Sequence, residues 1–407
     1  MKTAAQEHVM NDSNSALCSI TNKTRWGIVA IAICAGVIGA MQLGKVAPAI
    51  PIIEADLAIG RVTAGWIVSL ILAAGAFLGP VCGIVGDRVG HRSFLLFGLF
   101  IMFLGNVLGG FSPNASCLLA ARLVEGFGFL AIVIAAPSII VSITSTREVR
   151  LALGAWGAYM PAGISLIMVL APLLIDEISW RGLWLANAIL LFVFLIFFAK
   201  CTRGLGSASV DQTGIHDIKI AFSQAGPWLL AGCFAVFACQ FIGLISWLPT
   251  YFVEDVGYSA ATSGIIVACV VVLNAFGNLL GGGLLRLVRR SNLMAITSGS
   301  LGIIAVITFW PDMPEWAVIV LSAIFSFIGG FIPASVLTGV PRYATSPAQI
   351  GVTNGIVVQG ANVGALIGPP ALAASVTILG GWHMASWIIL SLGIVGVIIA
   401  LTLRSTE

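Results

Sequence analysis

Apolar stretches of membrane-spanning length alternate with short polar breaks along almost the whole chain. Most of these stretches reach the ~20 residues with which an α-helix crosses the hydrocarbon layer of a bilayer. Because no water is available there, each span has to pair its own backbone groups, which predicts helices. The predicted helices cover residues 27–50, 63–84, 94–112, 116–140, 151–175, 182–199, 227–252, 261–285, 293–310, 316–340, 350–378 and 383–403. The pattern predicts an all-α integral membrane protein with twelve transmembrane helices.

A polar connection rich in Gly, Ser and charged residues divides these helices into two groups of six. The predicted parts are a cytoplasmic N-terminal tail (1–26), a six-helix bundle (27–199), a cytoplasmic central loop (200–226), a second six-helix bundle (227–403) and a cytoplasmic tail (404–407). The two groups look like repeats, since GIVGDRVGHRS at 83–93 aligns with GGGLLRLVRRS at 281–291. Two parallel repeats are typical of transporters that bind their substrate between the halves near the middle of the membrane.

The composition narrows the class of protein. The chain is 59% hydrophobic and 9% charged, with a mean hydropathy of +1.08, and no polar stretch is long enough for a soluble enzyme domain. It contains no GxxxxGKS or GxxxxGKT sequence for nucleotide phosphates, so a gradient has to supply the energy for any transport. The eight cysteines are scattered without metal-ligand spacing, and we expect neither a metal nor another cofactor.

Lys and Arg residues predict the orientation in the membrane. With the N-terminus placed inside, fifteen of them fall in cytoplasmic segments and only Arg61 and Arg181 fall outside. Positively charged loops stay on the cytoplasmic side, so both termini are expected to be cytoplasmic, in a protein of the plasma (inner) membrane. The formal net charge of +3 then reflects orientation. We expect no nucleic-acid partner, because no basic cluster lies on a soluble face.

Two motifs resemble signatures of the major facilitator superfamily. GIVGDRVGHR at 83–92 is similar to the G-x-x-x-D-R-x-G-R-R loop between the second and third helices, with His91 in place of a basic residue. ARLVEGFGF at 121–129 is similar to the R-x-x-x-G-x-G sequence of the fourth helix. The resemblance implies the major facilitator fold and a secondary transporter that works by alternating access. We expect this transporter to be a monomer.

The loop between the second and third predicted helices is expected to act in gating. Its candidate residues are Gly83, Asp87, Arg88, Gly90 and Arg92. Asp87 is expected to hold one state of the cycle by capping a helix end or by pairing with a basic partner. Topogenic charge is an alternative explanation for Arg88 and Arg92.

Shorter stretches resemble the cyanate-permease-like branch of the same superfamily. They are GKVAPAIP (44–51), AGW (64–66), WGAYMPAG (156–163), SWLPTY (246–251) and GPP (368–370). The glycine-and-proline signature that drug–proton antiporters carry in the fifth helix is absent from GAWGAYMPAGISLIM. This difference argues against a drug exporter.

Three ionisable residues, Lys45, Arg122 and Glu125, lie within the predicted helices of the first half. A charge at bilayer depth costs at least ~2.5–3.5 kcal/mol, so a retained one points to function. Arg122 and Glu125 are three positions apart and can pair on one face of their helix. The pair either orients the helix or acts as a proton relay, in which Glu125 exchanges a proton when Arg122 moves away. The resemblance also implies proton coupling at Arg122, because the arginine of the fourth helix is often linked to it.

Lys45 stands near the outer end of the first predicted helix, with no acidic residue in obvious reach by sequence. It either extends to the membrane surface or faces a cavity and counters an anionic substrate. The second interpretation is favoured because the three residues together leave a charge of +1 when all ionise. The resemblance places the first, fourth, seventh and tenth helices around the cavity. The candidate substrate-binding residues are Gln42, Lys45, Arg122, Trp156, Tyr159, Gln240 and Trp247, and the candidate proton-coupling residues are Arg122 and Glu125.

We therefore expect a secondary active transporter, a proton symporter of a small anionic organic or inorganic solute, whose partners are that solute, protons and the lipid bilayer. Two alternatives stay open. A proton-driven exporter of drugs or metabolites would have the same fold, whereas a non-transporting receptor or a passive channel belongs to another class. A channel would show a continuous polar stripe through one bundle, and a receptor would show a longer soluble tail or loop.

Overall fold

The computed structural model describes residues 24–205, 222–343 and 347–404, except for the side chains of Pro80, Asp87, Pro347 and Ala348. The elements before the central connection are α2 (Trp26–Gly44), η1 (Ala47–Ala49), α3 (Ile50–Leu57), α4 (Arg61–Ser69), η2 (Leu70–Leu72), α5 (Ala73–Val89), α6 (His91–Gly110), α7 (Ala115–Ser142), α8 (Val149–Trp156) and α9 (Tyr159–Cys201). Those after it are α11 (Ala225–Glu254), α12 (Ala260–Leu284), α13 (Arg290–Thr308), α14 (Glu315–Gly329), α15 (Phe331–Gly339), η3 (Val340–Tyr343), α16 (Pro347–Leu379) and α17 (Trp382–Leu403). Within these ranges every regular element is a helix, which confirms the predicted all-α fold.

Eleven helical runs in the described residues are long and apolar enough to cross a membrane. One of them, Val149–Cys201, is 53 residues long, which is enough for two crossings of about 20 residues each. Its backbone leaves the helical conformation at Ser179, where φ is 64°. This break lies between the predicted fifth and sixth helices, so the eleven runs account for the twelve predicted crossings. The chain is a multi-pass membrane protein.

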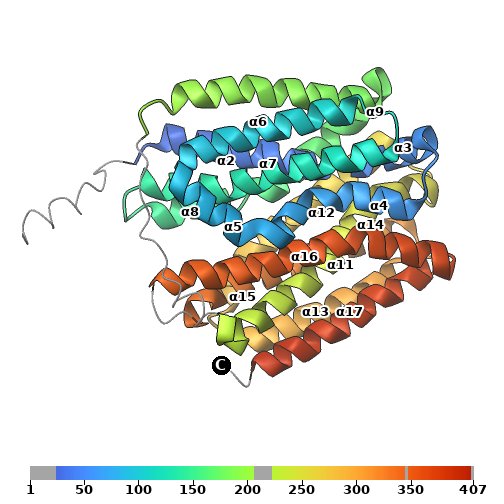
Figure 1. The fold of residues 1–407 in the computed structure, drawn as a ribbon. Helices are drawn as coiled ribbons and strands as arrows, with labels where there is room; N and C mark the ends of the chain where they lie inside the picture. The colour runs from blue at the N-terminus through green and yellow to red at the C-terminus, as the bar shows by residue number, and fades with distance from the viewer. Residues whose placement is uncertain (1–23, 206–221, 344–346, 405–407) are drawn as a thin grey trace, which may run out of the picture.

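The helices form two groups that lie side by side. In Figure 1 the first half of the chain, blue to green, lies beside the second half, yellow to red. The start of α2 and the end of α17 lie at one end of the molecule, which we call the proximal end; α3 and α4 meet at the opposite, distal end. The predicted domain boundaries stay a prediction, because most of the predicted central loop, 206–221, lies outside the described residues.

Glycines allow the helices of the second half to approach closely. α11 packs along α16, and Gly360, Gly364 and Gly368 of α16 lie against the backbone of α11. A Cβ atom at Gly364 would lie 1.9 Å from the carbonyl oxygen of Ala235, so no larger side chain fits at this position. Small residues spaced by four permit such packing in a membrane, where apolar area alone gives little attraction between helices.

The two halves touch through α4 and α5 with α16, and through α9 with α12. Gly65, near the distal end, lies against the backbone of Pro370. In the middle of the interface, Nε2 of Gln359 donates to the carbonyl oxygen of Ala76 at 2.7 Å. Gly65 and Gln359 thus mark contacts between the halves in the distal and middle parts of the interface.

Candidate functional site

The three ionisable residues that the sequence singles out meet in the interior of the first half. Lys45 follows the last residue of α2, at a break in the helix before η1. Its Nζ lies 3.1 Å from Oε1 of Glu125, although the two residues are 80 positions apart. The side chains of Lys45, Arg122 and Glu125 are all 0% exposed. Lys45 therefore does not extend to the membrane surface in this state, and Glu125 supplies the acid that its sequence neighbourhood lacks.

The ammonium group of Lys45 is fully satisfied by hydrogen bonds. It donates to Oδ1 of Asn106 at 2.6 Å and to Oε1 of Gln42 at 3.0 Å, in addition to Glu125. An ammonium group has three N–H donors, so each of them has one acceptor. Two of these acceptors are neutral amides, which can hold the lysine whether or not Glu125 is charged.

Arg122 pairs with the other oxygen of the same carboxylate, Oε2 of Glu125, as the spacing of three predicts. Its guanidinium also donates to the backbone carbonyls of Ile67 at 2.8 Å, Gln42 at 2.9 Å and Val68 at 3.3 Å. These bonds tie α7 to α2 and α4. Arg122 is thus held by three fixed backbone groups, whereas Lys45 is held by side chains alone.

Residues that the sequence analysis did not single out complete the site. Nε1 of Trp184 donates to Oε1 of Glu125 at 3.1 Å, and its ring centre lies 4.3 Å from Nζ of Lys45. Nε2 of Gln42 donates to Oδ1 of Asn187 at 2.9 Å. We call the following seven residues the buried charge cluster: Gln42, Lys45, Asn106, Arg122, Glu125, Trp184 and Asn187.

The buried charge cluster holds two cations and one carboxylate whose side chains are all 0% exposed. Its formal charge is +1 when all three groups ionise. Buried charges are tolerated only when they are paired and hydrogen-bonded, and removing one partner of a buried pair typically costs about 3–5 kcal/mol. Chemically, the cluster contains a carboxylate that can accept a proton. Its excess positive charge can attract an anion.

A glycine on α6 lets the cluster close. A Cβ atom at Gly105 would lie 2.7 Å from Cγ of Glu125 and 2.8 Å from its backbone nitrogen. We expect Gly105→Ala to destabilise the protein by about 1–3 kcal/mol, because α6 and α7 would have to separate. The measurement is thermal unfolding of the purified protein, followed by tryptophan fluorescence. Gly79→Ala in α5 is the matched control, since its Cβ atom meets nothing within 4 Å; equal losses in both variants would contradict this explanation.

Four other predicted binding residues lie apart from the buried charge cluster. Gln240 is buried in the second half and donates through Nε2 to the carbonyl oxygen of Ile389 at 2.8 Å. Trp247 is fully buried and donates to a carbonyl of α16. Trp156 and Tyr159 stack on each other, with ring centres 4.2 Å apart. No described hydrogen bond joins these four residues to the cluster, and their part in substrate binding stays a prediction.

The predicted gating loop is almost entirely helical, which corrects the prediction of a loop: Gly83, Asp87 and Arg88 lie in α5, Arg92 lies in α6, and Gly90 alone stands between the two helices. Gly90 has a φ of 90°. Residues with a side chain rarely adopt this backbone conformation, which explains why glycine stands at the turn. Arg92 donates to the hydroxyl group of Thr202 and to the carbonyl oxygen of Ala199, both at 3.0 Å, and so holds the end of α9. Arg88 is exposed. The side chain of Asp87 lies outside the described residues, so its gating role stays a prediction, as do those of its neighbours.

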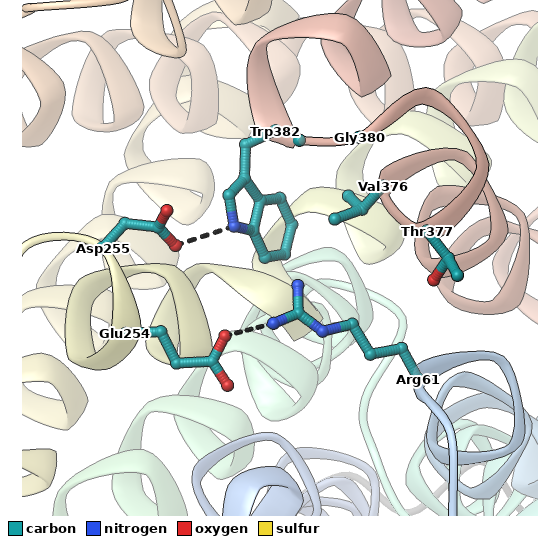
Figure 2. Close-up of a pocket in the computed structure, with 8 residues that line it drawn as sticks. Arg61, Glu254, Asp255, Val376, Thr377, Gly380 and Trp382 are labelled. Atoms are coloured by element: carbon teal, nitrogen blue, oxygen red, sulfur yellow. Dashed lines mark hydrogen bonds and ion pairs between the residues drawn. The ribbon is translucent and has the colours of Figure 1, made fainter.

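A pocket of about 490 Å³ lies at the distal end, between the two halves (Figure 2). Its lining residues are Arg61, Glu254, Asp255, Val376, Thr377, Gly380, Gly381 and Trp382. Arg61 points from the first half towards Glu254 and Trp382 of the second half. The sequence analysis counted Arg61 only as an outside charge. Among the described residues, no group of three or more His, Cys, Asp or Glu side chains is arranged to hold a metal ion.

Comparison with known proteins places these features in a family. The sequence profile of the Major Facilitator Superfamily matches residues 31–357. An uncharacterised MFS-type transporter of Mycobacterium tuberculosis is 24% identical over 393 residues, which cover 82% of this chain and 67% of that protein. The cyanate transport protein of Escherichia coli is 25% identical over 323 residues, which cover 78% of this chain and 81% of that protein.

Other comparisons are narrower or concern the fold alone. A multidrug resistance protein of Mycobacterium tuberculosis is 26% identical over 154 residues, covering 37% of this chain and 29% of that protein. A crystal structure of a bacterial homologue of the human lysosomal transporter Spinster, inward-facing and unoccupied, superimposes with a TM-score of 0.77. It is 14% identical and covers 95% of this chain and 96% of that one.

Proposed function

The chain belongs to the Major Facilitator Superfamily of transporters, and from this premise we propose that it carries a small anionic solute across the plasma membrane together with protons. The observation that supports this proposal most is the position of Glu125 between two cations in the buried interior of the first half. Both termini are expected in the cytoplasm, so that the distal end faces outside. The protein acts by alternating access, as a monomer.

Glu125 is the proposed proton carrier. Its two oxygens take hydrogen bonds from Lys45, Arg122 and Trp184. Both oxygens are therefore occupied by donors in this state. We propose that a cation moves away from Glu125, or that water enters, when this carboxylate takes up a proton during the transport cycle.

Lys45, rather than Arg122, is the cation that is placed to move. Arg122 is fixed by backbone carbonyls of two neighbouring helices. Lys45 stands at the break between α2 and η1, and η1 packs against α11 of the second half. A shift of the second half can therefore pull Lys45 away from Glu125, while Asn106 and Gln42 remain as its acceptors.

The excess positive charge of the cluster favours an anionic solute. A proton on Glu125 would raise the formal charge from +1 to +2, and a bound anion would lower it again. A bound proton then raises the affinity for the anion, and a bound anion raises the affinity for the proton, because such coupling is reciprocal. The relative named as a cyanate transport protein matches most of its own length, whereas the named multidrug relative matches 29% of its length. An anion is therefore the better supported solute, and drug export is the second candidate.

A ligand screen tests the charge of the solute. The purified protein is heated with cyanate, with small carboxylates or with drug-like organic cations, and its unfolding temperature is recorded. A ligand that binds the folded state raises that temperature. We expect stabilisation by at least one small anion and none by the cations. Stabilisation by cations alone would support the exporter and contradict the anion proposal.

A further inference from the structure

The distal end contains the same arrangement twice, once in each half. In the first half, Nε1 of Trp180 donates to Oδ2 of Asp56 at 3.1 Å. In the second half, Nε1 of Trp382 donates to Oδ2 of Asp255 at 2.8 Å (Figure 2). Each tryptophan stands at the start of the last crossing of its half, and each aspartate stands at the end of the first crossing. Corresponding contacts of this kind are expected from an internal repeat.

The two copies differ in the origin of their arginine. In the first half, Arg181 directly follows Trp180, pairs with Asp56 at 2.6 Å and places its guanidinium 4.3 Å from the centre of the Trp180 ring. In the second half, the residue that directly follows Trp382 is His383. The second half therefore has no arginine at the position corresponding to Arg181.

Arg61 supplies this cation from the first half. It pairs with Glu254, the neighbour of Asp255, and its guanidinium lies 5.7 Å from the centre of the Trp382 ring (Figure 2). Arg61 opens α4, whereas its partners belong to α11 and α17. We propose that Arg61 is the residue that holds the distal side of the interface closed, because it completes an arrangement of the second half from the first half.

The two arginines should respond differently to the transport cycle. The pair between Arg181 and Asp56 lies within one half and can persist while the halves rock against each other. The pair between Arg61 and Glu254 joins the halves, so it has to break before the distal side opens. Arg61 and Glu254 are 30% and 32% exposed, and Arg181 and Asp56 are 35% and 41% exposed. Exposed pairs of this kind change an equilibrium by about two- to fivefold, and the similar exposure makes Arg181 a matched control.

Distances between spin labels, measured by double electron–electron resonance on the full chain, test the proposal. In a cysteine-free background, labels at Ile178 and Ile378 report the width of the distal side. Labels at Leu151 and Leu287 report the width of the proximal side. All four side chains are exposed, and opening at one side is expected to accompany narrowing at the other.

Arg61→Gln is expected to raise the ratio of distal-open to distal-closed molecules about two- to fivefold. Glu254→Gln should shift the ratio in the same direction. Arg181→Gln should leave both distance distributions unchanged. His383→Arg should act like Arg61→Gln, because it gives the second half an arginine of its own. Unchanged distances in Arg61→Gln, an equal shift in Arg181→Gln, or a wild-type distribution in His383→Arg would each overturn the proposal. The measurement needs neither solute nor a pH gradient, so its outcome is independent of the proposed function.

Discussion

Replacement of Glu125 by glutamine is expected to abolish solute uptake driven by a pH gradient and to preserve exchange of solute for solute. Glutamine keeps the shape of the side chain but cannot take up and release a proton. Exchange needs no net proton movement, so it should continue at a rate within a few-fold of wild type. Both activities are measured on proteoliposomes, with radiolabelled solute and with or without an imposed pH gradient. Uptake should fall to the level of protein-free liposomes.

The fold is expected to tolerate this change, although at some cost in stability. Lys45 keeps the acceptors Asn106 and Gln42, and Arg122 keeps its three backbone carbonyls. The remaining cations lose their carboxylate, which typically costs about 3–5 kcal/mol in a buried pair. Glu148→Gln, in the loop before α8, is the control and should transport normally. If Glu125→Gln still concentrates solute in response to a pH gradient, the coupling site lies elsewhere.

Replacement of Lys45 by glutamine is expected to weaken anion binding about thirtyfold. The change removes the excess positive charge and leaves Arg122 and Glu125 as a neutral pair. At an effective dielectric constant of about 20, a unit charge about 8 Å from an anion contributes about 2 kcal/mol, which corresponds to about thirtyfold in Kd. The measurement is equilibrium binding of the anion that stabilises the wild-type protein most.

The double variant Lys45→Gln, Glu125→Gln separates charge from the loss of a particular side chain. It leaves Arg122 as the single charge, so the formal charge returns to +1. We expect anion binding to recover to within a few-fold of wild type, while uptake stays insensitive to a pH gradient. Weak binding in the double variant as well would mean that Lys45 acts by direct contact or by packing instead of through the net charge of the cluster.

The sequence could predict the helices and one of the ion pairs, because both depend on local spacing. Crossings follow from the length of the apolar stretches, and the pair between Arg122 and Glu125 follows from their separation by one helical turn. The sequence also separates the fifth and sixth crossings, because Asp176, Glu177 and Arg181 interrupt the apolar stretches on either side. The structure adds that the two crossings form one helical run, in which the backbone leaves the helical conformation at Ser179.

The other contacts of the candidate site could not be predicted, because they join distant parts of the chain. Nothing in the sequence around Lys45 indicates that Glu125 will face it from another helix. Asn106 and Asn187 could have been selected as candidates from the sequence, since each is an amide within an apolar stretch. Their partners depend on how α2, α6 and α9 pack. Gln240 lies in a helix that the resemblance places at the cavity, and its Nε2 donates to a carbonyl oxygen of α17; its part in substrate binding stays a prediction.

The distance along the chain between Lys45 and Glu125 has a consequence for biogenesis. The two residues are 80 positions apart, and synthesis of 80 residues takes about 4–16 s at the usual rates of translation. During that time the first crossing has to remain in the membrane although Glu125, the counterion of Lys45, has not yet been synthesised. A lysine near the end of a helix can meet this demand by extending to the interface, and it can move inward once α7 has arrived. We therefore expect the surface position, which the sequence left open as the alternative for Lys45, only before the fourth crossing is inserted.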